Sequence, residues 1–418
     1  MASGLYGIAT SALWVAATPW IAWRRSRAGR QWRERLGELP QHDDHPVWVH
    51  AASVGEVAAA DPIVREIVSR GASVLLTTMT PTGQRAAGDR LGDVARTAFV
   101  PLDFVPAVRR ALELTRPRSL VLVESELWPN LIEETSSAGV PVGLVNGRMS
   151  RRKAARAKWP FSPLRDALLS LTIVACRDRD DADGFEWLGI TEERLVVSGD
   201  AKYDMLPGPL PEAERKALRA SLGVRSDGSC VVFGSVRPRE EPHVVRAVAG
   251  LSGGVRVVLA PRHMRRVAPI KRALERVGVP VFQRTDASPP SGRGTVVVDT
   301  TGELARLYGA ADVAFVGGTL GGYGGHNPLE PASRGVPVLL GPDTRNCESA
   351  ARALVKRGGA VRVGSGRELG SVIVRLLSDD ARRTAAGEAA LDVVETGRGA
   401  AARTVDALDD AGLLESRR

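Results

Sequence analysis

Short apolar runs separated by helical stretches dominate this chain and limit most strongly how it can fold. In the first half such runs occupy residues 47–50, 73–79, 119–124, 140–146 and 171–176. They are apolar throughout, which is typical of parallel strands buried on both faces of a sheet. The pattern therefore predicts an α/β fold with a doubly wound parallel sheet.

A second series of apolar runs follows a proline-containing segment. That segment, residues 206–228, carries three prolines and then a charged stretch, and we interpret it as a linker. The later runs occupy residues 230–235, 255–260, 295–299, 313–318 and 336–341. Because 418 residues exceed one ordinary core, we predict two Rossmann-like domains, 24–205 and 229–418, that face a cleft.

The N-terminal residues 1–23 are expected to form a membrane anchor helix. Residues 2–23 carry no charge, and the next twelve residues contain six arginines against one glutamate. The apolar segment is just long enough to span a bilayer, and the arginines favour a cytoplasmic location for the remaining chain. A helix lying in the membrane interface is an alternative, whereas a cleaved signal peptide fits less well because no basic region precedes the apolar residues.

The net positive charge indicates which kind of partner the protein binds. The charge of +9 and sequence pI of about 10.0 indicate an acidic partner such as nucleic acid, phospholipid or a phosphorylated substrate. A basic stretch at 147–161 is either a solvated helix face or a contact with anionic lipid. The sequence has no GxxxxGK[ST], HExxH or paired CxxC motif, which argues against P-loop chemistry and a structural zinc. The acidic run 178–183 is expected to open a helix.

Charged residues follow several predicted strands, at the edge where ligands of parallel sheets bind. Glu56 comes one turn after the first strand and is suited to act as a general base, or simply complements a helix dipole. Glu124 and Glu126 end an apolar strand, where burial demands a partner or raises a pKa; alternatively one is solvated and one caps a helix. Lys202 either offsets developing negative charge or is an ordinary surface group.

A glycine-rich loop at 317–325 contains six glycines and leads into His326-Asn327-Pro328-Leu329-Glu330. Asn327 suits an N-cap, Pro328 a first helical position and Glu330 a capping box. Free amides and the helix dipole would then form an anion cradle, although the same residues also describe a plain strand–loop–helix turn. The other candidates for binding phosphate at strand ends are Arg237, Arg239, Arg262, His263 and the helix start at 301–303.

Taken together, several motifs resemble one family across nearly the whole chain. They are HAASVGE, TTMTPTGQ, VESELWPNL, NGRMS, GDAKYD, APRH, DTTGEL and GGHNPLEPA, in that order. They are similar to the 3-deoxy-D-manno-octulosonic acid (Kdo) transferases of lipopolysaccharide biosynthesis. The resemblance implies a GT-B fold and an inverting transfer of Kdo from CMP-Kdo to a lipid A precursor (lipid IVA). It also implies no metal or other cofactor, no nucleic acid, and attachment to anionic lipids at the cytoplasmic face of the inner membrane.

The resemblance also assigns roles to residues of this sequence. Glu56 matches the family's proton acceptor, and Glu124 and Lys202 match its transition-state stabilisers. The donor contacts match Pro261, Arg262, Thr301, Gly302, Glu303, Asn327, Pro328, Leu329 and Glu330. One departure is Tyr323, where many relatives have arginine. Two alternatives stay open: a GT-B enzyme that uses a UDP-sugar on a lipid or cell-wall intermediate, and a non-catalytic nucleotide-sugar-binding scaffold.

Overall fold

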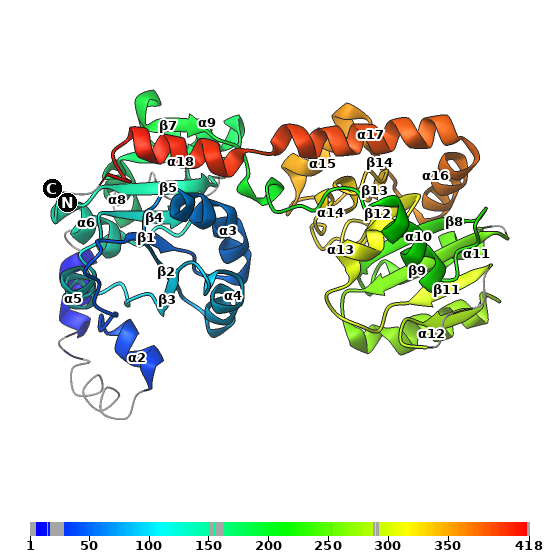
Figure 1. The fold of residues 1–418 in the computed structure, drawn as a ribbon, viewed down its shortest axis with the longest axis horizontal. Coiled ribbons are helices and arrows are strands. Elements are labelled where there is room, and N and C mark those ends of the chain that lie inside the picture. The colour runs from blue at the N-terminus through cyan, green and yellow to red at the C-terminus, as the bar shows by residue number, and fades with distance from the viewer. Residues whose placement is uncertain are drawn as a thin grey trace. The chain divides into compact units, whose positions relative to one another are not determined.

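The structure is a computed structural model, and it forms two compact units (Figure 1). It describes residues 6–14, 16, 29–149, 154–155, 157, 162–251, 253–286, 289 and 292–415. The first unit comprises residues 1–205 together with 397–418, and the second comprises residues 206–396. Each contains one seven-stranded sheet in which every pairing is parallel, so the predicted α/β class and the two doubly wound domains are confirmed.

The sheet of the first unit has the strand order β3-β2-β1-β4-β5-β6-β7. Its outermost strands, β3 and β7, were not predicted, because β3 begins with the polar residues Arg96 and Thr97 and β7 has only three residues, which are partly exposed. The strands are β1 (Val47–His50), β2 (Val74–Thr78), β3 (Arg96–Phe99), β4 (Ser119–Val123), β5 (Val142–Gly147), β6 (Ile173–Cys176) and β7 (Leu195–Val197).

Alternate strand residues of this sheet enter two separate cores. Trp48 and Leu120 pack with the helices of one face, whereas Val49 and Val121 pack with those of the other. The first face is covered by α5 (Val105–Thr115), α6 (Pro129–Ser137), α8 (Pro163–Leu169) and α9 (Arg179–Trp187). The second face is covered by α3 (Val54–Ser69), α4 (Pro81–Leu91) and α18 (Ala400–Asp410). Shorter elements are α2 (Arg30–Arg35), η1 (Glu192–Arg194) and η2 (Ala201–Tyr203).

Helix α3 continues through Pro62, although a proline inside a helix normally kinks or ends it. A proline inside a helix costs about 3 kcal/mol because it removes one hydrogen bond and crowds the preceding turn. Here the residues around it, Ala59, Ala60, Ile63 and Ile67, are fully buried against the sheet. Tertiary packing therefore outweighs the local preference and keeps the helix continuous.

The sheet of the second unit has the order β10-β11-β9-β8-β12-β13-β14, in which six strands repeat the order of the first sheet and β10 is an additional strand beside β11. Its outer strands β10 and β14 are only three residues long and were likewise not predicted. The strands are β8 (Ser229–Val236), β9 (Val255–Pro261), β10 (Val281–Gln283), β11 (Gly294–Val297), β12 (Val313–Val316), β13 (Val338–Leu340) and β14 (Ala360–Arg362). The helices are α10 (Glu212–Ser221), α11 (Glu241–Ala249), η3 (Met264–Arg266), α12 (Val267–Arg276), α13 (Leu304–Leu307), η4 (Tyr308–Ala310), α14 (Leu329–Ala332), α15 (Glu348–Arg357), α16 (Gly366–Ser378) and α17 (Asp380–Gly397).

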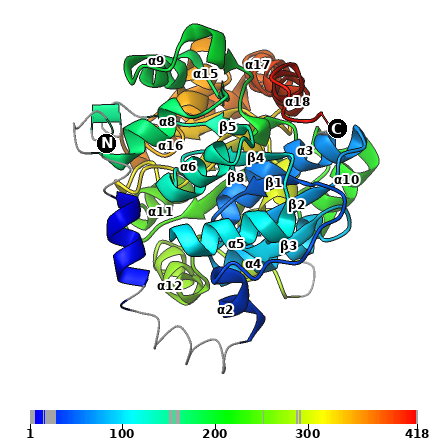
Figure 2. The same ribbon diagram turned by 90° about the vertical axis from the view of Figure 1, so that its left-hand side faces the viewer.

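Two domain boundaries differ from the prediction. The expected linker 206–228 contains α10, whose Leu218 and Leu222 are buried in the core of the second unit. The expected second domain, 229–418, ends near residue 396, because α18 returns to the first unit (Figures 1 and 2). Its residues Val405 and Leu408 are buried in the core that contains α3. The tail is rich in alanine and charged residues, so its apolar face gave too weak a signal to assign it to either domain.

Part of the predicted anchor lies among the described residues. Residues 6–14 are helical (dark blue in Figure 2), and the other residues of 1–23, apart from residue 16, lie outside the described part, as does most of the basic stretch 147–161. The hydroxyl of Tyr6 donates to Asp103 at 3.1 Å, and Asn130 donates to the hydroxyl of Thr10 at 3.0 Å. Within the residues that the structure describes, no helix combines the length and apolar character needed to cross a bilayer.

Candidate active site

An acidic site lies at the carboxyl ends of β1 and β4, which are neighbours in the first sheet. Glu56 stands in the first turn of α3, directly after β1, and Glu124 directly follows β4. Lys202 comes from η2, after β7, and its ammonium lies 2.5 Å from the Glu124 carboxylate. The structure thus brings Glu124 and Lys202 into contact, and it sets Glu56 at the neighbouring strand end.

Glu56 has both properties that the sequence left open. Its carboxylate accepts a hydrogen bond from the backbone of Ser53 at 2.9 Å, which forms a capping box at the start of α3. Burial and the negative charges of Glu126 and Glu124 nevertheless raise the pKa of Glu56 to about 7, against the opposing backbone bond. A carboxylate with a pKa near neutrality can accept a proton and is suited to general-base catalysis.

Glu124 sits on strained backbone. Its φ of 61° lies in the left-handed region, which costs a non-glycine residue about 1–3 kcal/mol and is typical of functional sites. Asn146, at the end of the neighbouring strand β5, has a φ of 50°, and its side-chain oxygen accepts from the amide of Ala201 at 3.0 Å. The strand ends are therefore shaped to direct these two side chains toward the segment that carries Lys202.

Glu126 is a residue of this site to which the sequence assigned no role of its own. The indole of Trp128 donates to its carboxylate at 2.9 Å, so the side chain is fixed beside the other acids. After burial, Glu126 is the largest contributor to the raised pKa of Glu56. Sequence could only note two acids at the end of a strand, because the orientation of each depends on the turn between β4 and α6.

A basic site occupies the corresponding edge of the second sheet. Arg262 follows β9 directly and is exposed, and its charge acts on both His326 and Glu330. Arg237 follows β8, its guanidinium lies 2.9 Å from Nε2 of His263, and it stacks on the ring of Tyr323 with 4.9 Å to the centroid. Because β9, β8 and β12 are adjacent strands, these cations gather at one edge, where a phosphate or carboxylate would be attracted.

Burial and this positive surrounding, chiefly Arg262, lower the pKa of His326 to about 4. Its ring is therefore neutral at physiological pH, and its buried Nε2 has no hydrogen-bond partner among the described residues. The neighbouring Tyr323 receives a second guanidinium from Arg239, 5.8 Å from the ring centroid. The departure at Tyr323 thus takes the form of an aromatic side chain that holds two arginines.

The glycine loop does not present the free amides that were predicted. Fully buried Glu240 accepts from the amides of Gly318 at 2.6 Å and Leu320 at 2.7 Å, and Asp343 accepts from that of Gly324 at 2.8 Å. The amides of 323, 325 and 326 donate to carbonyl groups of the same loop. The chain's own carboxylates therefore occupy much of the expected anion cradle.

The helix start at 327–330 is also smaller than predicted. Helix α14 has four residues, and the Asn327 side chain accepts from the amide of Leu329 at 3.1 Å rather than forming a capping box with Glu330. Burial raises the pKa of Glu330, opposed by its hydrogen bond to Asn327 and by Arg262. Pro328 and Leu329 are buried. A helix of one turn has little dipole, so any ligand contact here comes from side chains and loop backbone.

The remaining predicted donor contacts lie at the ends of β9 and β11. Thr301 and Gly302 are exposed, with φ of 87° at Gly302, and Glu303 pairs with Arg284 at 3.3 Å and with the hydroxyl of Thr300. Pro261 ends β9 in a buried position.

The acidic run 178–183 opens α9, where Asp178 caps the amide of Asp181 as predicted. It therefore has the local structural role that the sequence predicted. Among the described residues no three His, Cys, Asp or Glu side chains are grouped to hold a metal ion.

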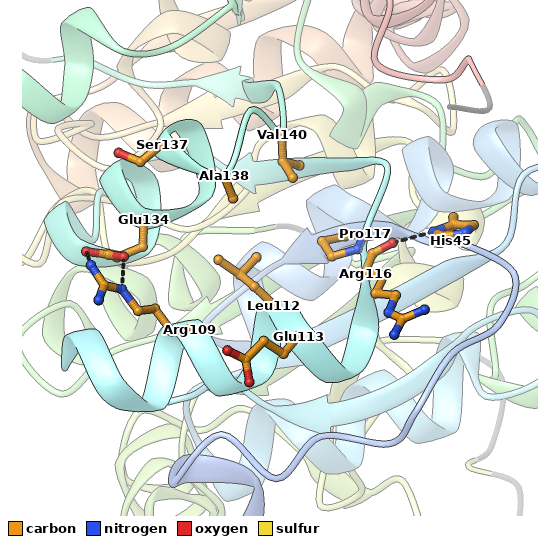
Figure 3. A pocket seen from close by; sticks show the side chains of 10 residues that line it. All are labelled: His45, Arg109, Leu112, Glu113, Arg116, Pro117, Glu134, Ser137, Ala138 and Val140. Carbon is orange, nitrogen blue, oxygen red and sulfur yellow. Dashed lines mark hydrogen bonds and ion pairs between the residues drawn. The ribbon is translucent and has the colours of Figure 1, made fainter. Parts of the chain in front are cut away.

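A cavity of about 550 Å³ lies at the opposite edge of the first sheet (Figure 3). Pro117 and Val140, which line it, precede β4 and β5, whereas Glu124 follows β4. Two of its lining residues, Arg109 and Glu134, form an ion pair at 2.6 Å. The cavity is therefore separated from the acidic site by the length of the strands. Its lining comprises His45, Arg109, Leu112, Glu113, Arg116, Pro117, Glu134, Ser137, Ala138 and Val140.

Comparison with known proteins identifies relatives over nearly the whole chain. A family model described as 3-deoxy-D-manno-octulosonic-acid transferase (kdotransferase) matches residues 30–205. A 3-deoxy-D-manno-octulosonic acid transferase of Bordetella pertussis is 36% identical over 98% of this chain and 99% of that protein. A protein of the same name from Haemophilus influenzae is 31% identical over 87% of this chain and 86% of that protein.

Solved structures share the fold at low identity. A UDP-GlcNAc 2-epimerase from Neisseria meningitidis has a TM-score of 0.61 at 13% identity and covers 87% of this chain and 100% of that chain. A glycosyltransferase from Rickettsia africae also has a TM-score of 0.61, at 10% identity over 90% of this chain and 100% of that chain. The fold is thus α/β of the GT-B type, built from two Rossmann-like domains.

Proposed function

This chain belongs to the 3-deoxy-D-manno-octulosonic acid transferase family, and from that premise we propose that it transfers Kdo from CMP-Kdo to a lipid A precursor. The acceptor would be lipid IVA, and the transfer would invert the configuration of the anomeric carbon. The observation that carries the proposal is the acidic site, where Glu56 has a pKa of about 7 beside the Glu124–Lys202 pair.

Glu56 acts as the general base in the proposed mechanism. Its carboxylate takes the proton of an acceptor hydroxyl, and the oxygen's electron pair attacks the anomeric carbon of Kdo. The bond from that carbon to the phosphate oxygen breaks, and CMP leaves with the electron pair. One displacement of this kind inverts the anomeric centre. A positioned general base contributes about 10²- to 10⁴-fold to such a rate.

Lys202 and Glu124 act on charge near the reacting centre. The ammonium of Lys202 offsets negative charge that develops as the bond to the phosphate breaks, and Glu124 fixes that ammonium at 2.5 Å. Glu124 in turn favours positive charge on the sugar in an oxocarbenium-like transition state. The strained backbone at Glu124 supports this role, because it holds the carboxylate where the lysine reaches it.

The basic edge of the second unit binds the donor in this proposal. Arg262 contacts the phosphate of CMP, and the exposed backbone of Thr301 and Gly302 and the side chains of Glu303, Asn327 and Glu330 contact the nucleoside. Pro261, Pro328 and Leu329 shape the surface around them. The cluster of Arg262 and Arg237 supports an anionic donor, because guanidinium groups bind phosphate through paired hydrogen bonds.

Mass spectrometry of the reaction tests the function. The enzyme is incubated with tetra-acylated lipid A precursor and either CMP-Kdo or a panel of UDP-sugars. We expect the acceptor mass to rise by a Kdo unit with CMP-Kdo and not to change with UDP-sugars. A product formed from a UDP-sugar would make the chain a different GT-B enzyme. Donor binding without any product would indicate a non-catalytic binder.

We also infer that the N-terminal segment attaches the protein to the cytoplasmic face of the inner membrane. The described helix 6–14 supports this, because Ile8 and Leu13 are 68% and 58% exposed on it. Co-sedimentation with vesicles that contain anionic lipid measures the attachment. The double variant Ile8→Ser, Leu13→Ser should bind fewer vesicles than the wild type, and equal binding would contradict the inference.

A further inference from the structure

The C-terminal helix α18 forms several hydrogen bonds with the segment that carries Lys202. The carboxylate of Asp204 accepts from the amides of Gly399 at 2.6 Å and Ala401 at 2.7 Å, at the start of the helix. The first amides of a helix have no partner within it, and a carboxylate there is stabilised by both charge-assisted bonds and the dipole. Asp204 is therefore an N-terminal cap supplied from nearly two hundred residues away in the sequence.

Two other contacts fix the opposite end of the same segment. Nε of Arg403 donates to the carbonyl of Ser198 at 2.9 Å, and the hydroxyls of Thr404 and Ser198 bond at 2.8 Å. Gly199 has a φ of 101°, and a Cβ there would lie 3.0 Å from the Arg403 guanidinium. Only glycine fits this close approach without displacing the arginine. Residues 198–204 are thus held by α18 at both ends.

Lys202 lies in the middle of this held segment. Its amide donates to the Asp200 side chain and the preceding amide, of Ala201, donates to Asn146, each at 3.0 Å. The lysine side chain is 40% exposed, and a long exposed side chain normally forms only a weak ion pair because ordering it costs entropy. A fixed backbone reduces the number of positions that the ammonium can take, and so favours its contact with Glu124.

The hydrogen bonds of Asp204 lie next to both residues at which the chain leaves and re-enters the first unit. The chain leaves the first unit after Met205, one residue beyond Asp204, and re-enters it at Gly397, two residues before Gly399. The two segments are in close contact there, because a Cβ on Gly397 would lie only 2.3 Å from the ring of Tyr203. Lys202 therefore lies on the backbone that anchors both segments.

We propose that Asp204 is a positioning residue for Lys202: by capping α18 it holds the backbone on which Lys202 meets Glu124. The part that concerns catalysis rests on the proposed function, in which Lys202 acts on the developing charge. The part that concerns the position of Lys202 does not depend on it, and the two parts are tested separately.

Competitive labelling of lysines with acetic anhydride, read by peptide mass spectrometry, tests the position without any substrate. Removal of the cap in Asp204→Ala should raise the labelling of Lys202 at least about fivefold, which corresponds to the net contribution of about one hydrogen bond between uncharged groups. Exposed Lys216 on α10 is the internal standard and should not change. Asp406→Asn, on the same helix but paired with Arg70, is the control variant and should leave Lys202 as in the wild type.

A second variant protects this test against misfolding. If circular dichroism shows that Asp204→Ala is unfolded, Asp204→Asn decides, because its side-chain oxygen keeps one amide bond but lacks the charge. A smaller rise in Lys202 labelling is then expected. Labelling of Lys202 equal to that of the wild type in the folded variant overturns the proposal, whether or not the enzyme transfers Kdo.

A double-mutant cycle tests the catalytic part. Asp204→Ala alone should lower kcat about tenfold, while in a Lys202→Ala background the same change should lower it less than about twofold, because residues that act through one another are not additive. Equal losses in both backgrounds would mean that Asp204 serves stability alone. Absence of Kdo transfer by the wild type would reject the proposed function and leave the labelling result standing.

Discussion

The two units share the order of six strands, with the additional strand, β7 or β10, on opposite sides of the sheet, and they differ in the charge at the carboxyl ends of the strands. In the first unit the strand ends carry Glu56, Glu124 and Glu126 with Lys202. In the second unit the strand ends carry Arg237, Arg262 and the histidines His263 and His326. Burial and nearby arginines lower the pKa of both histidines. The scaffold fixes where a ligand binds, and the residues after each strand decide the chemistry. In the proposed function, proton transfer takes place at the acidic edge and anion binding at the basic edge.

The largest expected effect comes from neutralising the acidic edge. Glu56→Gln keeps a side-chain oxygen for the capping box but cannot accept the acceptor's proton. We expect kcat to fall at least ~10²-fold with the KM for donor little changed, which is the lower end of the loss of a general base. Release of CMP measures the rate. Glu66→Gln, on the same helix but paired with Arg70, is the matched control, and near-normal turnover by Glu56→Gln would remove this residue from the mechanism.

At the basic edge, the carboxylate of Glu240 stabilises the loops that follow the strands. Glu240 is fully buried and accepts from three amides, of Arg237, Gly318 and Leu320. Glu240→Ala should lower the free energy of unfolding by about 3 kcal/mol, because buried amides lose charged acceptors. Urea unfolding of the whole chain measures it. Exposed Glu275→Ala on α12 should have little effect, and an equally small effect of Glu240→Ala would mean that the loop does not depend on this carboxylate.

The pH dependence of the rate sharpens the comparison. Since the pKa of Glu56 is about 7 and the proposed mechanism requires its base form, kcat/KM should rise with pH to a plateau above 7. Below that value it should fall about tenfold for each pH unit. A stopped series of rates from pH 5 to 9 gives the profile. A rate that is constant from pH 5 to 7 would show that Glu56 is not the group that titrates.

The smallest effect concerns stability. The folded pKa of Glu56 is about 7 and its ordinary value is 4.5, so the folded state is favoured at low pH and loses that stabilisation as pH rises from 4.5 to 7. Above 7 the folded protein carries an unfavourable charge, worth about 1 kcal/mol after allowance for its partial exposure. Glu56→Gln should therefore unfold at a higher urea concentration than the wild type at pH 8. The two proteins should be nearly equal at pH 4, and equal stability at both pH values would contradict the raised pKa.

Much of the fold follows from local patterns in the sequence. Apolar runs predicted the ten central strands, and the strand-end rule predicted where Glu56, Glu124 and Arg262 would lie. The strands at the sides of each sheet were not predicted, because they are short and partly exposed. The position of α18 was not predicted, because it depends on contacts with α3.

The details of both sites depend on contacts between distant residues. The amides of the glycine loop were expected to be free, yet Glu240, about eighty residues earlier, accepts from two of them. Similarly, Glu126 owes its orientation to Trp128, and the C-terminal residues 399 and 401 bind Asp204. No local motif encodes such pairings, because each is formed only when the sheet and its helices have packed.

The division between the two edges is tested most directly by calorimetric titration of CMP into three proteins: the wild type, Glu56→Gln and Arg262→Ala. We expect Glu56→Gln to bind CMP with wild-type affinity and Arg262→Ala to bind at least about tenfold more weakly, since a charged hydrogen bond contributes about 1.5–3 kcal/mol. Arg272→Ala, exposed on α12, should match the wild type. Loss of CMP affinity in Glu56→Gln as large as that in Arg262→Ala would contradict this division of roles.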